Sequence, residues 1–507
     1  MGNRDIEAAR NYHATTKHSY TSVRTDAHYL DWDNRPMPYK LYPEVSGLAL
    51  PRDLSLARVP ALEAIAAGAV PDAGGGELTL DALTRILFCA DGLTRRTRVG
   101  GEDYHFRAAP SAGALYPIEI YAAVAQTGEL EQGLYHFSPA DLRLRGLRRG
   151  DWRALIARAA AGRPALLSAR AVLVLSAIFW RSTWKYRARA YRYCFWDGGT
   201  MLANLLAAAA AEGLSTELVT AFADPEIEAL LGIDGEREGA LCLVAIGSGA
   251  NAPGAGPELR PLDLETVELS REEVSYPDLV RMHQASRLLT SDEAAAVADA
   301  RVDALAPSPP SADALKLEPL DASTGLSLGE TILRRGSTRA FAHRAIAAEQ
   351  LAAIMAASSR HPRADFPSLS DTYLIVNAVD GMEPGAYYYR RQSGEFEMLK
   401  TGNFRREAGY LCLEQPLGAD CSVLVCYMAD LERALSALGN RAYRDAHLEA
   451  GLHGGQVYLA AYAMGRGATG LTFYDDETAA FFAPHAAGKS PLLMVAVGVP
   501  RSSDEET

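Results

Sequence analysis

The sequence predicts an α+β protein in which one domain of helices and strands occurs twice. Strand-like apolar runs alternate with helical patterns in both halves of the chain. Landmarks in the first half also recur 251 or 252 positions later, at Gly133/Gly385, Val172/Val423, Tyr191/Tyr443 and Gly247/Gly498. A period of this length indicates a tandem duplication of a whole domain rather than a solenoid.

Composition excludes several classes of function. The 507 residues are enough for two or more domains, and the net charge of −13 argues against a nucleic-acid partner. No uncharged apolar run of about 18 residues is present, so we expect no membrane span. The N-terminus has no apolar signal core, so a cytoplasmic protein is expected. Six cysteines without C-x-x-C spacing should be reduced and packed in the interior. The histidines show no spacing typical of metal ligands, so we predict no metal site.

Four segments follow from these patterns. We expect an N-terminal arm over 1–45, a first domain over 46–250, a connector over 251–325 and a second domain over 326–507. The arm is rich in aromatic and charged residues, which is typical of a segment clamped over the body. The connector is predicted to wrap around the body and to contain helices over 277–289 and 292–304, followed by a Pro/Ser stretch at 306–311.

The elements of the first copy can be read in order from periodicity and cap residues. A helix is expected from Leu80 after the Thr79 cap, and a long helix over about 191–211. The expected strands are 118–124, 133–137, 171–175 and 241–246. Corresponding patterns return in the second copy near 385–389, 423–425, 443 and 496–498.

A loop of small residues precedes the 118–124 strand. Ser111, Ala112 and Gly113 leave the backbone uncovered, so a flat ligand can lie on it, although an ordinary turn would use similar residues. The segment Pro110–Pro117 resembles the P-S-A-G-A-L-Y-P signature of SagB-type dehydrogenases, a branch of the FMN-dependent nitroreductase superfamily. That resemblance implies antiparallel or mixed sheets wrapped by helices. It also implies FMN contacts for Pro110, Ser111, Ala112, Gly113 and Leu115.

The second copy opens with a basic motif, Arg334-Arg335-Gly336-Ser337-Thr338-Arg339. Cations and a hydroxyl on about one helical turn suit a phosphate, although a solvated basic face is the plainer interpretation. The motif resembles the R-R-S-x-R-x-F opening of the superfamily. The resemblance implies that Arg335, Ser337 and Arg339 bind the ribityl chain, phosphate and ring of FMN.

A glycine-rich segment near the end of the second copy, 465–476, is either a helix end with a turn or a ligand-facing backbone. It resembles the superfamily segment beside flavin N5, which implies cofactor contacts for Gly470, Thr472 and Phe473. Arg501 is predicted either to reach a phosphate or to be a free tail arginine.

The two copies differ in complementary ways. The first copy has no basic motif, whose counterpart should fall near residues 55–65. The second copy has Ala437 and Leu438 where the first has Lys185 and Tyr186, and Pro367–Ser370 only weakly echoes the loop. We therefore expect an intrachain pseudo-dimer with one composite flavin site, a mirror-related site that stays empty, and an open question of further homodimerisation.

Lys185 and Tyr186 are the candidate catalytic residues. A neighbouring ammonium favours phenolate and should lower the tyrosine pKa, although a surface lysine beside a packed tyrosine is common. SagB-type enzymes carry a Lys-Tyr pair here, which implies oxidation of an azoline-like heterocycle on a peptide or small molecule by hydride transfer to flavin. The alternatives are an NAD(P)H-dependent nitro- or quinone reductase, and a non-catalytic flavin-binding subunit of a peptide-modifying complex.

Overall fold

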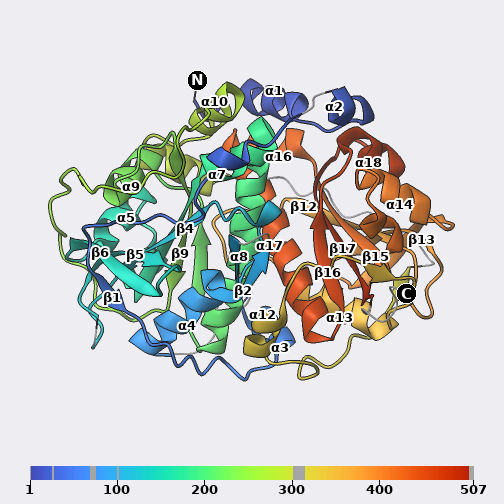
Figure 1. The fold of residues 1–507 in the computed structure, drawn as a ribbon, viewed down its shortest axis with the longest axis horizontal. Coiled ribbons are helices and arrows are strands. Elements are labelled where there is room, and N and C mark those ends of the chain that lie inside the picture. Colours follow the sequence, from blue (N-terminus) through green and yellow to red (C-terminus); the bar gives the residue numbers. More distant parts are fainter. Residues whose placement is uncertain are drawn as a thin grey trace.

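The computed structural model describes residues 2–25, 28–68, 76–99, 102–128, 130–300 and 314–501. The predicted Pro/Ser stretch at 306–311 lies outside these residues. Two sheets flank a central pair of long helices, and the N-terminal arm crosses the top of both halves (Figure 1). This arrangement confirms the predicted α+β fold with two similar domains in one chain.

The first sheet has seven strands in the order β1-β6-β5-β4-β7-β9-β8. All its pairings are antiparallel. The central strands are buried on both faces, which explains why their sequences are mainly apolar rather than alternating. The bounds are β1 Gly47–Ala49, β4 Ile118–Val124, β5 Gly133–Ser138, β6 Arg143–Arg149, β7 Ala171–Ile178, β8 Thr216–Val219 and β9 Glu238–Ile246.

The second sheet repeats the first. Its order is β10-β14-β13-β12-β15-β17-β11, with β16 also paired to β17, so each strand of the first sheet has a counterpart in the same position. The bounds are β10 Leu315–Lys316, β11 Phe341–Ala342, β12 Ser370–Val376, β13 Gly385–Arg390, β14 Glu395–Thr401, β15 Val423–Ala429, β16 Gly467–Leu471 and β17 Ser490–Pro500. The shared strand order confirms the duplication read from the sequence.

Two long helices, α8 (Ala190–Ala211) and α17 (Arg441–Ala463), form the centre of the molecule. Glycines let their backbones meet. A Cβ on Gly199 would lie 2.3 Å from the Leu448 carbonyl oxygen, and a Cβ on Gly451 would lie 2.5 Å from the Trp196 carbonyl oxygen. Gly199 and Gly451 are 252 positions apart, so the helices cross at equivalent points of the two copies.

Reciprocal buried ion pairs join the copies. Two arginines at the start of each central helix, or directly before it, bind one aspartate of the other copy, and all six side chains are at most 4% exposed. The pairs are Arg189 and Arg192 with Asp475, and Arg441 and Arg444 with Asp224. Because a buried charge needs a partner, neither copy can separate without exposing or orphaning these groups. The chain therefore forms an intrachain pseudo-dimer.

The arm and connector pack against the two copies. In the arm, the Tyr12 hydroxyl donates to the Ala188 carbonyl (2.5 Å), while Asn3 donates to the Leu438 carbonyl (2.9 Å), so the arm is clamped over both halves. The predicted connector helices are shorter than expected. The arm and connector helices are α1 Glu7–Thr15, α2 Tyr20–Thr25, α10 Pro277–Ala285 and α11 Ser291–Ala298.

The remaining helices pack around the central helices and the two sheets (Figure 1). In the first copy these are α3 Ala61–Ala67, α4 Leu80–Asp91, α5 Arg153–Ala159, α6 Pro164–Ser168, α7 Phe179–Tyr186 and α9 Asp224–Leu231. In the second they are α12 Leu328–Arg334, α13 Ala348–Ser358, α14 Arg405–Leu411, α15 Pro416–Asp420, α16 Leu431–Leu438 and α18 Asp475–Phe481. Among the described helices, none has both the length and the apolar character needed to cross a bilayer. All six cysteines are free and buried, as predicted.

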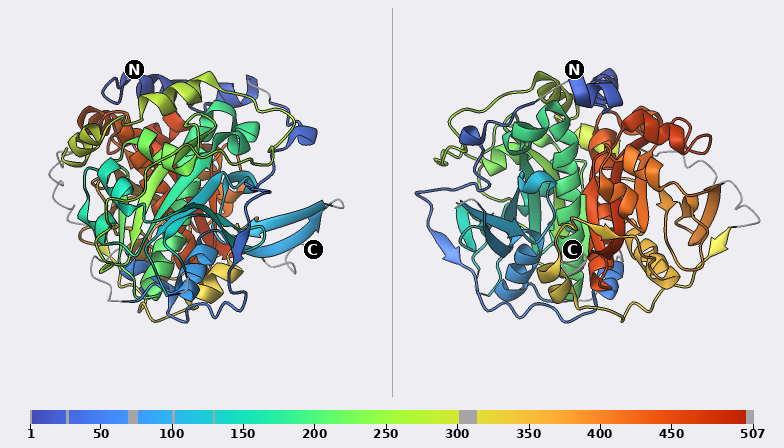
Figure 2. Two further views of the ribbon diagram at one scale, coloured as in Figure 1. Left: turned by 90° about the vertical axis from the view of Figure 1, so that its left-hand side faces the viewer. Right: turned by 45° about the vertical axis from the view of Figure 1, so that its right-hand side comes forward.

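A hairpin that the sequence did not predict projects from the first copy (Figure 2). It consists of β2 (Leu93–Val99) and β3 (Glu102–Arg107), and β3 leads directly into the loop of small residues. The hairpin therefore stands at the entrance to the region where the sequence places its candidate site.

Candidate functional site

The loop of small residues is held open by a buried carboxylate. Ser111 Oγ and the Ala112 N–H donate to Asp197 of α8 at 2.5 and 3.0 Å. Gly113 has φ +63°, in the left-handed region that favours glycine, and its surface is exposed. Burial raises the pKa of Asp197 to about 7, despite these two hydrogen bonds. The loop is thus fixed with the backbone of Gly113 accessible.

Arg335 of the second copy reaches this loop of the first copy. Its Nε and Nη2 donate to the carbonyl oxygens of Ala108 and Arg107, both at 2.8 Å, and the residue is 8% exposed. Arg335 comes after α12 has ended at Arg334, in an extended segment. The expectation of a basic motif on one helical turn is therefore wrong. Because α12 ends before Arg335, the Arg335 side chain can extend from the second copy to the first.

Lys185 and Tyr186 lie at the exposed glycine. They end α7, and a Cβ on Gly113 would lie 2.8 Å from the Tyr186 hydroxyl and 3.3 Å from Lys185 Nζ. The Lys-Tyr pair and the small-residue loop are more than 70 positions apart in the sequence. The fold thus brings these two predicted site elements into contact.

The ionisation of the pair differs from the sequence-based expectation. Burial raises the pKa of Tyr186 well above its ordinary value, with Tyr193 and Asp197 adding to the effect, so the predicted lowering by Lys185 is wrong. The pKa of Lys185 is lowered, first by burial and then by the positive charges of Arg339 and Arg35. Lys185 is therefore the member of the pair that is shifted toward a neutral, proton-accepting form.

Aromatic stacking links the pair to the second copy. The Tyr186 and Tyr193 rings stack with centroids 4.1 Å apart and an interplanar angle of 8°. The Tyr193 hydroxyl donates to Thr472 Oγ1 at 3.2 Å, immediately after β16. Thr472, a predicted cofactor residue, is thus adjacent to the predicted catalytic pair.

Gly470 and Ser337 are joined through one side chain of α17. The Gly470 N–H donates to the Tyr458 hydroxyl (2.5 Å), and Ser337 Oγ lies 3.4 Å from the same oxygen. Gly470 is exposed, although its neighbours Thr469 and Leu471 are buried. Each copy therefore presents an exposed glycine, Gly113 from one and Gly470 from the other.

Two predicted residues are placed differently. Phe473 is fully buried, with the Arg189 guanidinium 5.4 Å from its ring centroid, so the structure does not expose it to a ligand. Arg501 donates to the Phe341 carbonyl (3.2 Å) and lies 3.6 Å from Asp420. Its guanidinium is thus held at the β11–β17 edge of the second sheet.

Positive charge is concentrated around the loop. Arg339 and Arg35 both lower the pKa of Lys185, and Arg95 of the projecting hairpin lowers that of Arg335, to which burial contributes most. Arg339 itself is exposed. Cations that raise one another's electrostatic energy in this way favour an anion among them.

The mirror-related position is sealed by the chain itself. The segment corresponding to the small-residue loop is 362–369, and it pairs with β8, the counterpart of β16. The Leu218 N–H donates to the Arg363 carbonyl (2.9 Å), and Asp365 accepts from the N–H groups of Thr220 and Ala221, both at 2.9 Å. Contacts from β8 and the residues after it thus cover this segment, whereas Gly113 in the corresponding loop of the first copy is exposed.

The first copy also has no counterpart to Arg335. Helix α3 takes the place of α12, since a bridge links Pro60 with Ser327 just before the two helices. The residues after α3, from Gly68 to Gly76, include no arginine or lysine. The predicted location near 55–65 was close, and the absence of a clamp there agrees with the asymmetry inferred from the sequence.

Sequence reasoning missed Asp197, Tyr193 and Tyr458. Asp197 carried a signal, because it is the single acid within the apolar helix α8. The tyrosines carried none, since their roles depend on contacts between the two copies.

Comparison with known proteins agrees with this geometry. The Nitroreductase family model matches residues 76–248 and 332–499, more than half of the chain. MJ1384 of Methanocaldococcus jannaschii, named as a nitroreductase, is 34% identical over 170 residues, covering 34% of this chain and 81% of that protein. The trifolitoxin-processing protein TfxB of Rhizobium leguminosarum bv. trifolii is 30% identical over 180 residues, covering 32% of this chain and 46% of TfxB.

A solved structure shares the whole architecture. The crystal structure of a protein from Anabaena variabilis ATCC 29413, also named as a nitroreductase, superposes with a TM-score of 0.77 and 26% identity. The match covers 97% of this chain and 99% of that one, so both copies and their arrangement are shared. The chain therefore belongs to the nitroreductase family of oxidoreductases, with the family's domain present twice in one polypeptide.

Proposed function

We propose that the chain is an FMN-dependent oxidoreductase of the SagB type, which oxidises a carbon centre in an azoline-like heterocycle of a peptide or small molecule. One observation carries the proposal: the two copies contribute different parts of a single site. The first provides the loop around Gly113 with Lys185 and Tyr186, and the second provides Arg335 and the backbone at Gly470.

The residues present fit FMN. Exposed backbone at Gly113 and Gly470 suits a flat ring, and the excess of positive charge suits a phosphate. In the described part of the chain, no hydrogen bond is recorded for the N–H of Thr472, a partly exposed residue directly after β16, so this N–H is available to a ring nitrogen. Ser337 and Arg339 would hold the ribityl chain and phosphate, while Arg335 fixes the loop against the ring.

The chemistry divides between cofactor and protein. FMN, when bound, supplies the hydride acceptor. Lys185 is placed to accept the proton that leaves the substrate, because burial and neighbouring cations make its ammonium form less favourable. Tyr186 stays a neutral phenol and donates a hydrogen bond to the substrate or to Lys185.

A peptide substrate is supported by one relative. TfxB is named for processing trifolitoxin, and the shared segment spans just under half of that protein. The hairpin β2–β3 projects from the first copy (Figure 2), and β3 ends at Arg107, whose carbonyl accepts from Arg335, so the hairpin adjoins the proposed site.

The test compares Lys185→Gln with wild type in an aerobic assay on an azoline-containing peptide. We expect bound FMN to be retained and kcat to fall by about 10²-fold or more, which is the scale of a lost general base. In wild type kcat/KM should rise with pH through the lowered pKa of Lys185, and this dependence should vanish in the variant. Lys17→Gln is the control, because Lys17 pairs with Asp476 on the outer surface of the arm.

Two outcomes would favour other functions. Rapid anaerobic bleaching of the flavin by NAD(P)H, with no azoline turnover, would indicate a nitro- or quinone reductase. Protein that binds FMN, turns over neither class of substrate and co-purifies with a modifying enzyme would indicate a non-catalytic subunit.

A further inference from the structure

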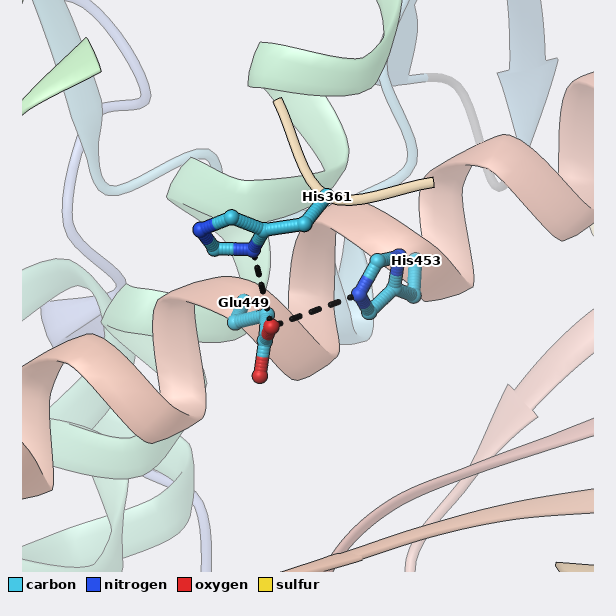
Figure 3. Close-up of side chains that lie close together, drawn as sticks. All are labelled: His361, Glu449 and His453. Atoms are coloured by element: carbon cyan, nitrogen blue, oxygen red, sulfur yellow. Dashed lines mark hydrogen bonds and ion pairs between the residues drawn. The ribbon is translucent and has the colours of Figure 1, made fainter. Parts of the chain in front are cut away.

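The second copy contains a cluster of two histidines and one glutamate that the flavin site does not use. Glu449 and His453 lie one turn apart on α17, and His361 lies between α13 and β12. One ligand atom from each side chain lies within 4.8 Å of the others. Figure 3 shows both imidazole rings facing the same carboxylate oxygen of Glu449.

Glu449 is the counterpart of Asp197, 252 positions later in the sequence. Each carboxylate accepts hydrogen bonds from the segment before the corresponding strand, and for Glu449 the donors are the N–H groups of Leu369 and Ser370 (2.9 and 2.8 Å to Oε2). Because Oε2 accepts both backbone hydrogen bonds, Oε1 is the oxygen that faces His361 and His453.

The outer nitrogens of the two rings fix their protonation. His361 Nε2 lies 2.9 Å from the Phe366 carbonyl oxygen, which can only accept, so Nε2 carries a hydrogen. His453 Nδ1 lies 3.1 Å from Gln456 Oε1 and, with the amide in this orientation, donates a hydrogen to it. In the neutral rings, the inner nitrogens therefore point lone pairs at Glu449 Oε1, across 3.0 Å for His361 and 3.6 Å for His453.

The inner nitrogens of His361 and His453 and the Oε1 atom of Glu449 repel one another through their lone pairs unless a proton or a metal ion lies among them. His453 is fully buried, and within the described chain its Nε2 has no hydrogen-bond partner. A second proton on His361 would bridge the shorter gap but would leave His453 Nε2 bare. A metal ion would bond all three atoms, and histidines that bind metals usually donate their outer N–H to an acceptor as these two do.

We propose that His361, Glu449 and His453 bind one divalent transition-metal ion, for which Zn²⁺ is the best match. Tetrahedral zinc with nitrogen and oxygen ligands places neighbouring ligand atoms about 3.3–3.5 Å apart, and the two distances here, 3.0 and 3.6 Å, bracket this spacing. The His361 side chain is 23% exposed, so the cluster reaches solvent at this residue.

The neighbouring charges allow such an ion. The Arg391 guanidinium lies 3.9 Å from Glu449 Oε1, but it donates to the hydroxyls of Ser368 and Ser370 at 2.7 and 3.0 Å. Those hydroxyls, rather than Glu449, accept the hydrogen bonds of the guanidinium, so Oε1 is left without a hydrogen bond from Arg391. The ion ties the 361–370 segment to α17, and so it stabilises the sealed mirror position rather than taking part in catalysis.

The test uses the full chain after dialysis against EDTA, titrated with Zn²⁺ by calorimetry and with Co²⁺ by visible absorption. We expect one equivalent of Zn²⁺ per chain, a tetrahedral Co²⁺ spectrum and a higher Tm with metal. His361→Ala and His453→Gln should each weaken binding by about 100-fold or more. His343→Ala is the matched control, because His343 is exposed and pairs with Asp420 elsewhere.

The outcomes separate clearly. Absence of Zn²⁺ binding by the wild type, or an affinity in both cluster variants equal to that of the wild type, would overturn the proposal and leave a protonated His361 paired with Glu449. Should His453→Gln fail to fold, His361→Ala alone decides, because His361 is half-buried in an irregular segment. FMN content, read from the flavin absorption, should not change in any of these variants.

Discussion

Replacing Arg335 with methionine tests whether the second copy holds the loop of the first. The change removes two 2.8 Å hydrogen bonds to carbonyl oxygens of the other copy while keeping much of the side-chain volume. Each bond from a charged donor contributes about 1.5–3 kcal/mol. The Ala108 carbonyl keeps its bond from Asn204, whereas the Arg107 carbonyl is left buried without this donor.

The net loss is smaller than the sum of both bonds, because wild type carries the cost of burying the guanidinium, which also lowers its pKa. We expect Arg335→Met to lower the free energy of unfolding by about 2–4 kcal/mol. Loss of the loop position should also weaken FMN binding by about tenfold or more, which corresponds to about 1.4 kcal/mol.

The assays are urea unfolding of the cofactor-free protein and fluorescence titration with FMN. Arg334→Met is the matched control, because Arg334 is the preceding residue and its side chain is 63% exposed, with Glu330 4.0 Å away. That control should change stability by no more than about 0.5 kcal/mol. Equal stability and equal FMN affinity in both variants would refute the clamp.

Three further predictions concern Gly113, Asp197 and the central helices. Gly113→Ala should reduce kcat/KM more than the control Gly213→Ala. Both glycines have φ near +65°, but only at Gly113 would the added methyl contact Tyr186 and Lys185. Equal kcat/KM in the two variants would contradict this. Asp197→Asn should gain stability relative to wild type as pH rises from about 4 to about 7. The raised pKa means that folded wild type holds a proton on Asp197 that the unfolded chain has released, so the wild type loses stability over this range and the variant does not. Parallel pH dependences of the unfolding free energy in urea would exclude this. Gly199→Ala should destabilise by about 1–3 kcal/mol or more, because the methyl would meet the Leu448 carbonyl; an unchanged urea midpoint would disprove this packing.

The fold could be predicted from the sequence because the pattern of strands and helices occurs in both halves of the chain. Strands over 118–124, 133–138 and 171–178 are mainly apolar or aromatic, and similar runs return about 252 positions later. The β2–β3 hairpin escaped prediction because its strands are rich in charge and are not packed into a sheet core.

The site was only partly readable. The loop around Gly113, the Lys185-Tyr186 pair and Arg335 stand out as local motifs. The direction of the Tyr186 pKa was misjudged, because burial depends on Tyr193 and on the fold around it rather than on the neighbouring Lys185. The sealing of the mirror position depends on Asp365 meeting Thr220 across 145 positions, for which a single sequence carries no signal.

The most direct test of the composite site is the number of FMN molecules that one chain binds. The purified protein, saturated with FMN and freed of excess ligand, is denatured, and released flavin is compared with chain concentration from amino-acid analysis. The asymmetry between the open position at Gly113 and the sealed position at Asp365 predicts one FMN per chain. Two FMN per chain, or FMN binding that survives replacement of both Arg335 and Arg339, would contradict it.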